Sequence, residues 1–118
     1  MEFNPAIPIY LQIMERIKKD IVTGQLPGGE RIESVRSLAE KFGVNLNTIQ
    51  RACAELEREK IITTQRGIGS FVTEDQEVIK ALKENMSETL VNDFLAGMYG
   101  LGFAKSEIIN LIKKADKE

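Results

Sequence analysis

Hydrophobic residues recur at helical spacing in two short stretches that flank residues 43–45. The apolar positions of the two stretches are Val35, Leu38, Ala39 and Phe42, followed by Ile49, Ala52, Cys53 and Leu56. Residues that repeat every three or four positions form one face of an α-helix. Gly43 can take the left-handed conformation that ends a helix, and Asn45 can cap the next one. The pattern predicts a helix-turn-helix whose second helix covers residues 46–59.

A different pattern begins after residue 60. β-branched residues dominate positions 61–64, and Ser70, Phe71 and Val72 follow a turn that contains Gly67 and Gly69. Two such runs around a glycine turn indicate a β-hairpin, which here would form a wing beside the helices. The helix pair and the hairpin together predict a winged helix-turn-helix.

Amphipathic stretches lie on both sides of this region. Before it, an apolar face between Pro8 and Gly24 consists of Tyr10, Ile13, Met14, Ile17 and Ile21. After it, we expect an acidic helix that is broken at Gly97, Gly100 and Gly102, and then a last helix. The sequence therefore predicts a mainly α fold with a small β-hairpin. A winged helix-turn-helix domain at residues 1–73 would precede a two-helix segment at residues 74–118.

The C-terminal segment carries more apolar surface than two helices can bury alone. A second copy of the chain could cover this surface, which would give a homodimer with twofold symmetry. The alternative is that the segment packs on its own winged-helix domain. The residues that we expect at a dimer interface are Leu82, Met86, Leu90, Phe94, Met98, Ile108, Leu111 and Ile112.

Residues 34–72 resemble the DNA-binding domain of GntR-type bacterial transcription regulators. The matching positions are Ser34, Arg36, Leu38, Ala39, Val44, Asn45, Thr48, Ile49, Ala52, Leu56, Arg66, Gly67, Gly69, Ser70, Phe71 and Val72. The chain departs from the family pattern at Glu33, Leu46 and Lys60, where proline, arginine or proline, and glycine are usual. Pro8-Ile9-Tyr10 and the Leu-Gly-Phe run from residue 101 resemble the YtrA-like subgroup, although Ala104 replaces a capping serine. That resemblance implies a repressor whose targets are genes for membrane transport.

The predicted winged-helix fold indicates a set of residues that could contact double-stranded DNA. They are Arg36, Asn45, Leu46, Asn47, Thr48, Gln50, Arg51, Arg66 and Gly67. Asn47 or Gln50 could read adenine, Arg51 could take guanine or a phosphate, and Leu46 could touch a thymine methyl. Simpler readings exist for some of them. Arg36 could be a solvated surface residue, Asn45 and Thr48 could only cap their helix, and residues 66–67 could form an ordinary turn.

The net charge of −2 and the pI near 5.3 are unusual for a protein that binds DNA. The acidic excess lies in the C-terminal segment, whereas residues 1–73 hold ten Lys and Arg against nine Asp and Glu. DNA binding must therefore come from a local patch and should be salt-sensitive. Glu55, Glu57 and Glu59 would repel DNA, so only the first half of their helix should approach it.

Composition also limits the chemistry. With no histidine and a single cysteine, neither an intramolecular disulfide nor a zinc site is expected, and Cys53 should be an inert core thiol. No nucleotide-binding glycine loop or nucleophile–base pair is evident, so we expect neither an enzyme nor a cofactor. No stretch is long enough for a membrane span, which favours a cytoplasmic protein. The main alternative to a regulator is a winged-helix protein–protein adaptor, and the sequence leaves a small-molecule effector open.

Overall fold

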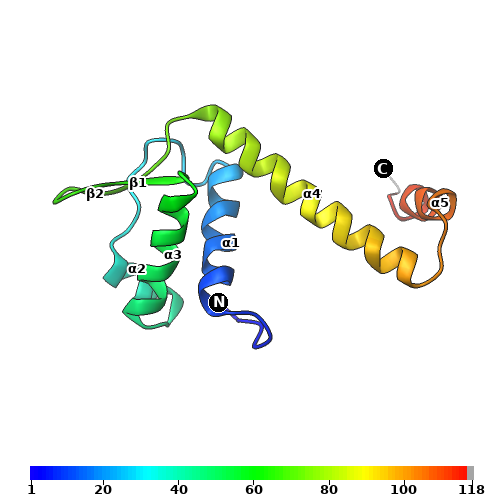
Figure 1. Ribbon diagram of the computed structural model, residues 1–118, viewed down its shortest axis with the longest axis horizontal. Coiled ribbons are helices and arrows are strands. Elements are labelled where there is room, and N and C mark those ends of the chain that lie inside the picture. Colours follow the sequence, from blue (N-terminus) through cyan, green and yellow to red (C-terminus); the bar gives the residue numbers. More distant parts are fainter. Residues whose placement is uncertain (117–118) are drawn as a thin grey trace. The chain divides into compact units, whose positions relative to one another are not determined.

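The computed structural model describes residues 1–116, which divide into two compact units at the Lys83–Glu84 boundary. The elements in chain order are α1 (Ile9–Val22), α2 (Val35–Phe42), α3 (Leu46–Arg58), β1 (Ile62–Gln65), β2 (Gly69–Val72), α4 (Gln76–Gly100) and α5 (Lys105–Ala115) (Figure 1). The predicted mainly α fold with one small hairpin is confirmed.

Local signals fix both ends of the turn between α2 and α3. Ser34 caps α2, since its hydroxyl accepts a hydrogen bond from the Ser37 N–H at 3.1 Å. Gly43 ends α2 in the left-handed conformation, with φ at 69°. The Asn45 side chain then accepts a hydrogen bond from the Thr48 N–H at 2.9 Å and starts α3. The helix-turn-helix predicted from the sequence is therefore built as expected.

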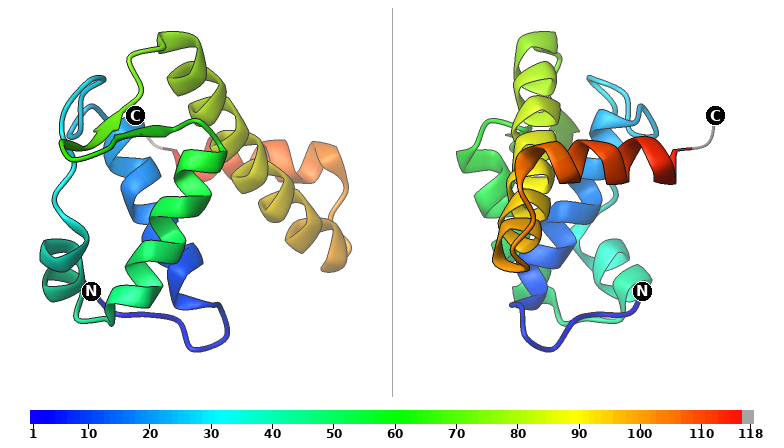
Figure 2. Two further views of the ribbon diagram at one scale, coloured as in Figure 1. Left: turned by 60° about the vertical axis from the view of Figure 1, so that its left-hand side comes forward. Right: turned by 90° about the vertical axis from the view of Figure 1, so that its right-hand side faces the viewer.

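The core of the first unit joins one face of each of its three short helices to the hairpin. Its most buried large side chains include Ile13 of α1, Ile49 and Leu56 of α3, and Ile62 and Val72 of the hairpin. α3 packs against both α1 and α2, and α1 and α3 run side by side in Figure 2. This packing holds the opposite face of α3 toward solvent.

The hairpin pairs β1 with β2 in antiparallel register, with Ile62 opposite Val72 and Gln65 opposite Gly69. Lys60 precedes it with φ at 65°, which is the left-handed conformation that glycine adopts most readily. This geometry accounts for the family's usual glycine at this position. The lysine takes the same conformation at some cost in backbone strain.

The second unit contains most of α4 and all of α5. Contrary to the sequence expectation, Gly97 does not break α4, which continues to Gly100. A helical glycine is tolerated where the surrounding residues favour a helix, at a cost of about 1 kcal/mol relative to alanine. α5 starts without a side-chain cap at Ala104, but the Glu107 carboxylate accepts a hydrogen bond from the Ala104 N–H at 2.9 Å. That bond supports the first turn, which the absence of a serine left without a cap.

Two of the eight residues that were expected at a dimer interface are buried within the chain. Leu82 belongs to the first unit and is 8% exposed, and Ile108 in α5 is 2% exposed. The first compact unit, residues 1–83, includes the start of α4. Within residues 1–116, no helix combines the length and the apolar character needed to cross a membrane.

Candidate nucleic-acid interface

The N-terminal half of α3 presents polar side chains to solvent on the face away from the core. Asn47 and Gln50 are exposed, and Leu46 is 40% exposed. Within residues 1–116, neither the Asn47 nor the Gln50 side-chain amide has a hydrogen-bond partner. Each amide offers both a donor and an acceptor, which is the combination that reads adenine in the major groove. This face of α3 can therefore bind base edges without breaking an existing interaction.

Asn45 and Thr48 are bound to each other at the start of α3. The Asn45 Oδ1 atom accepts hydrogen bonds from both the Thr48 N–H and the Thr48 hydroxyl, each at 2.9 Å. The prediction that Asn45 caps this helix is confirmed. The capping bonds use the side-chain oxygen of Asn45, so its side-chain NH2 group remains available as a donor.

Arg51 has a partner that the sequence analysis did not identify. Its guanidinium carbon lies 4.0 Å from the centre of the Tyr10 ring, and its Nη2 atom donates a hydrogen bond to the Tyr10 hydroxyl at 3.3 Å. A guanidinium stacked on an aromatic ring gains a cation–π interaction. Tyr10 is half-buried, and this contact joins α1 to α3. The two residues lie far apart in sequence, so no local pattern could have paired them.

Two other arginines that were predicted to contact DNA form no ion pair within the described residues. Arg36 lies in the first turn of α2, and Arg66 lies in the hairpin turn, next to Gly67, whose φ is 79°. Both side chains are exposed, and neither forms an ion pair within the described part of the chain. An unpaired guanidinium can bind phosphate without first losing a carboxylate partner.

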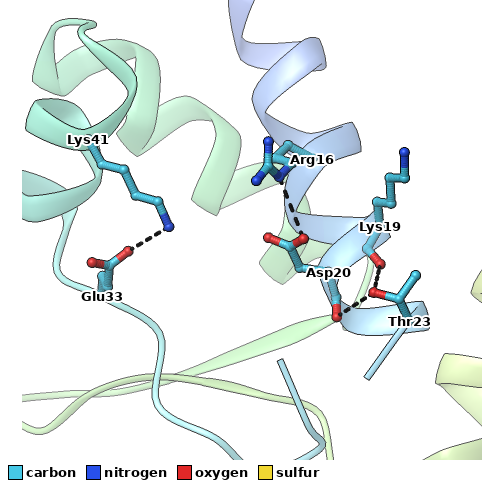
Figure 3. A network of polar contacts seen from close by, with 6 residues as sticks. All are labelled: Arg16, Lys19, Asp20, Thr23, Glu33 and Lys41. Carbon is cyan, nitrogen blue, oxygen red and sulfur yellow. Dashed lines mark hydrogen bonds and ion pairs between the residues drawn. The ribbon is translucent and has the colours of Figure 1, made fainter. Parts of the chain in front are cut away.

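Several other basic side chains of the same unit are paired. Arg16 contacts Asp20 at 3.5 Å, and Lys41 contacts Glu33 at 3.4 Å (Figure 3). These pairs neutralise part of the unit's acidic charge, whereas Arg36 and Arg66 keep their positive charges unpaired. The near-zero charge of residues 1–73 thus does not describe the surface on which these two arginines lie.

The two glutamates in the second half of α3, Glu55 and Glu57, and Glu59 directly after it all have partners. Glu55 pairs with Arg58, Glu59 pairs with Lys18 at 3.1 Å, and the Glu57 carboxylate accepts a hydrogen bond from the Thr64 hydroxyl at 2.7 Å. These contacts weaken the repulsion of DNA that their charges alone would cause. The polar, uncharged part of α3 remains its N-terminal half.

Cys53 is a half-buried thiol on α3. Burial raises the pKa of this thiol above its ordinary value, and the nearby Glu57 carboxylate raises it further. A thiol with a raised pKa forms little thiolate at neutral pH and is a poor nucleophile. The structure gives Cys53 the environment of a packing residue.

The first compact unit holds all of the predicted DNA-contact residues. In Figure 1, α2 and the free end of the hairpin lie on the same side of α3, and α1 lies on the other side. The helix α3 thus lies between α1 on one side and, on the other side, α2 and the hairpin, which carry Arg36 and Arg66. Arg51, in contrast, is turned toward α1.

Comparison with known proteins agrees with this arrangement. Residues 9–72 match the family described as "Bacterial regulatory proteins, gntR family". The uncharacterized HTH-type transcriptional regulator YhcF of Bacillus subtilis is 38% identical over 112 residues, which cover 95% of this chain and 93% of YhcF. The HTH-type transcriptional repressor YtrA of the same organism is 34% identical over 99 residues, covering 79% of this chain and 76% of YtrA.

Solved structures give the same result. A GntR family transcriptional regulator from Listeria monocytogenes superposes with a TM-score of 0.90 at 45% identity, covering 95% of this chain and 98% of that protein. The DNA-binding domain of AraR in complex with operator ORX1 has a TM-score of 0.58 at 27% identity, over 62% of this chain and 93% of that domain. The resemblance to YtrA-like regulators is confirmed. This chain belongs to the GntR family of bacterial regulatory proteins, and it is a DNA-binding transcription regulator rather than an enzyme.

Proposed function

We propose that this protein is a homodimeric repressor that binds an inverted-repeat operator through its first compact unit. The observation that carries the proposal is the pair of exposed amides without a hydrogen-bond partner on α3, Asn47 and Gln50, in the same compact unit as Arg36 and Arg66, which form no ion pair within the described residues. Amides supply selectivity for bases, and arginines supply affinity for the phosphate backbone. The first compact unit contains both kinds of group.

The individual roles follow from chemistry. Asn47 or Gln50 reads a base edge, and Leu46 rests against a thymine methyl. Arg36 and the Asn45 side-chain amide hold phosphates near the helix N-termini. Thr48, whose hydroxyl donates to the Asn45 Oδ1 atom, holds that side chain in place. Arg66 enters the minor groove, while Gly67 lets the hairpin backbone come close. We assign Arg51 a positioning role, because its guanidinium is held on the Tyr10 ring.

The dimer rests on the apolar residues that the second unit leaves in solvent. Leu90 is 71% exposed, Phe94 45% and Ile112 51%. Large apolar side chains at such exposure, gathered in one small unit, indicate a surface that another protein covers. Leu111 is 40% exposed, and Met86 and Met98 are half-buried. A symmetric dimer presents two α3 helices to DNA, which requires an inverted repeat.

Repression is supported by the similarity to YtrA, a protein named as a transcriptional repressor. Binding over a promoter would exclude polymerase in the bacterial cytoplasm. Control of membrane-transport genes follows only from the resemblance to YtrA-like regulators. The second unit is too short to enclose a large ligand cavity by itself, so an effector would need another site.

Selection of random duplex DNA by the purified protein tests the proposal. At 50 to 200 mM salt, roughly the range over which phosphate contacts weaken binding strongly, we expect recovery of an inverted repeat. Gln50→Ala should change which base is preferred, and Arg36→Ala should weaken binding to every sequence alike. Binding that is unselective at all salt concentrations would contradict the proposal and favour a protein–protein adaptor.

A further inference from the structure

Arg31 lies beside the hairpin, although it comes before α2 in the chain. It forms an antiparallel bridge with Phe71 of β2. Backbone hydrogen bonds hold this pairing on both sides, from the Ile32 N–H to the Ser70 oxygen at 2.8 Å and from the Val72 N–H to the Glu30 oxygen at 2.9 Å. The segment around Arg31 therefore acts as a short additional strand of the wing.

Alternation along a strand places Arg31 on the outer face of this small sheet. Ile32 is 6% exposed and Val72 is 2% exposed, so their face is the core face. Successive side chains of a strand point to opposite faces. Arg31 and its bridge partner Phe71 thus share the other face, and Arg31 is exposed. Its charged group is held on the solvent side of the wing.

The Arg31 guanidinium points toward the hairpin turn and rests against Gly69. A Cβ atom added at Gly69 would lie 2.7 Å from the Arg31 Nε atom and 3.2 Å from both its Cζ and Nη2 atoms. Gly69 also has φ at 143°, a conformation that residues with a side chain rarely adopt. Gly69 is opposite Gln65, the residue before Arg66. The glycine therefore provides the space in which a second guanidinium reaches the base of the turn.

No acidic group holds Arg31 there. Within residues 1–116 it forms neither an ion pair nor a hydrogen bond, whereas Arg16, Lys18, Lys41 and Arg58 each contact a carboxylate. An oriented arginine with free donors is suited to bidentate binding of a phosphate. Sequence reasoning missed it because the residue precedes the helix-turn-helix and reaches the wing only through the folded sheet.

We propose that Arg31 is a further DNA-binding residue, which contacts a backbone phosphate beside the groove that Arg66 enters. Gly69 is then needed for two reasons. It adopts the backbone conformation that the hairpin requires, and it leaves room for the Arg31 side chain. This inference rests on the proposed function, since it adds a contact to the same DNA-binding surface. A phosphate contact predicts an effect on affinity and on salt dependence, with no effect on base preference.

The test uses the full chain and a duplex obtained by the random selection described above. Arg31→Gln keeps part of the side-chain stem and removes the charge. The slope of log K against log salt should become shallower by about 0.9 per bound protomer, or about 3-fold less loss of affinity per protomer between 50 and 200 mM salt. Binding to a scrambled duplex should weaken equally, and Arg31→Lys should restore most of the slope.

Lys19→Gln is the matched control, because it removes one positive charge from the same unit. The Lys19 side chain extends away from Asp20 in Figure 3 and has no ion pair within the described residues. The neighbouring Lys18 pairs with Glu59, just after the C-terminal end of α3, so this part of α1 lies away from the start of the recognition helix. The salt slope of Lys19→Gln should equal that of the wild type.

Gly69→Ala tests whether the Arg31 side chain needs the space beside residue 69. It should reduce the slope in the wild-type background and cause no further reduction when combined with Arg31→Gln. Since Gly69→Ala also strains the backbone, thermal melting of each variant must accompany the titrations. If it fails to fold, the Arg31→Gln and Arg31→Lys comparison still decides the question.

Two results would overturn the proposal and leave the general function intact. One is a wild-type slope for Arg31→Gln while Arg36→Gln and Arg66→Gln flatten it. The other is an equal loss of melting temperature in Arg31→Gln and Arg31→Lys with unchanged slopes, which would make Arg31 only a structural residue of the wing. If the wild-type protein itself shows no salt-dependent DNA binding, the proposed function fails instead.

Discussion

The two compact units treat their apolar residues differently. In the first unit, Ile13, Ile49 and Leu56 are fully buried, and the large apolar residues left in solvent lie toward the chain start or at single positions such as Leu46 and Ile68. Among the described residues of the second unit, Ile108 is the one buried hydrophobic residue, and eight large ones are exposed. These are Leu90, Val91, Phe94, Tyr99, Leu101, Ile109, Leu111 and Ile112. A core that closes within one chain suits a module that meets DNA. An open apolar surface suits a module that meets another chain.

The same comparison extends to charge. The first unit leaves Arg31, Arg36 and Arg66 without an ion pair on its surface, whereas six of its twelve acidic side chains form ion pairs or hydrogen bonds within the described residues. Net charge alone would have argued against DNA binding. The charges close to the bound DNA matter more than the net charge, because salt screening limits the interaction of exposed charges with DNA to about 10 Å.

The largest expected effect comes from placing a charge on the open surface of the second unit. Phe94→Lys should prevent dimerisation, since a lysine cannot be buried there without a partner. Loss of the second half-site contact should weaken operator binding by roughly 100-fold or more. Sedimentation and operator titration measure both changes. Asn92→Lys, which adds the same charge at an exposed polar position of α4, should remain dimeric. A dimeric Phe94→Lys would place the interface elsewhere.

A truncation in the core of the first unit should have the next largest effect. Ile49→Ala removes a fully buried side chain of α3 and should lower the free energy of unfolding by about 2–5 kcal/mol. Urea denaturation measures this change. Ile68→Ala, at a turn position that is 56% exposed, should change the stability by less than about 0.5 kcal/mol. Similar losses for the two variants would refute the assignment of the core.

A smaller effect is expected for the base-reading amide. Gln50→Ala should cost about 1–3 kcal/mol of binding to the selected operator and almost none to a scrambled duplex. The matched variant Arg36→Ala should weaken both equally. Fluorescence anisotropy with the two duplexes separates the cases. An equal loss on both duplexes for Gln50→Ala would move base recognition to another residue of α3.

The smallest effect concerns Cys53. Because burial raises the pKa of this thiol above its ordinary value of 9.0, alkylation at pH 8 should be slower in the folded protein than in urea. The folded state holds the proton more tightly, so the contribution of this thiol to stability should be fully present below pH 9.0 and be lost as the pH rises above that value. Equal alkylation rates in both states would show that the thiol is accessible.

Local patterns predicted most of the fold. The caps at Ser34 and Asn45 and the left-handed Gly43 were readable because each acts within three residues of its own position. The extension of α4 through Gly97 was not predicted, since the preference of the flanking residues outweighs one glycine. The burial of Leu82 and Ile108 within the protomer also depends on tertiary packing, which helical spacing alone does not reveal.

The candidate site was predictable only in part. The exposed amides of α3 follow from helical periodicity, and their freedom from partners is what the structure adds. The stacking of Arg51 on Tyr10 and the position of Arg31 against Gly69 join residues that are distant in sequence. Such contacts depend on how the elements meet, and no spacing rule encodes them.

The central claim is that the second unit assembles two copies of the chain so that two first units share one DNA site. Sedimentation of the full protein on a selected duplex tests this claim most directly, because it counts the protomers that are bound. The account predicts two protomers on each inverted repeat, bound in a single step, and a weak complex with one protomer when one half-site is scrambled. One protomer per intact site, or undiminished affinity for a single half-site, would contradict it.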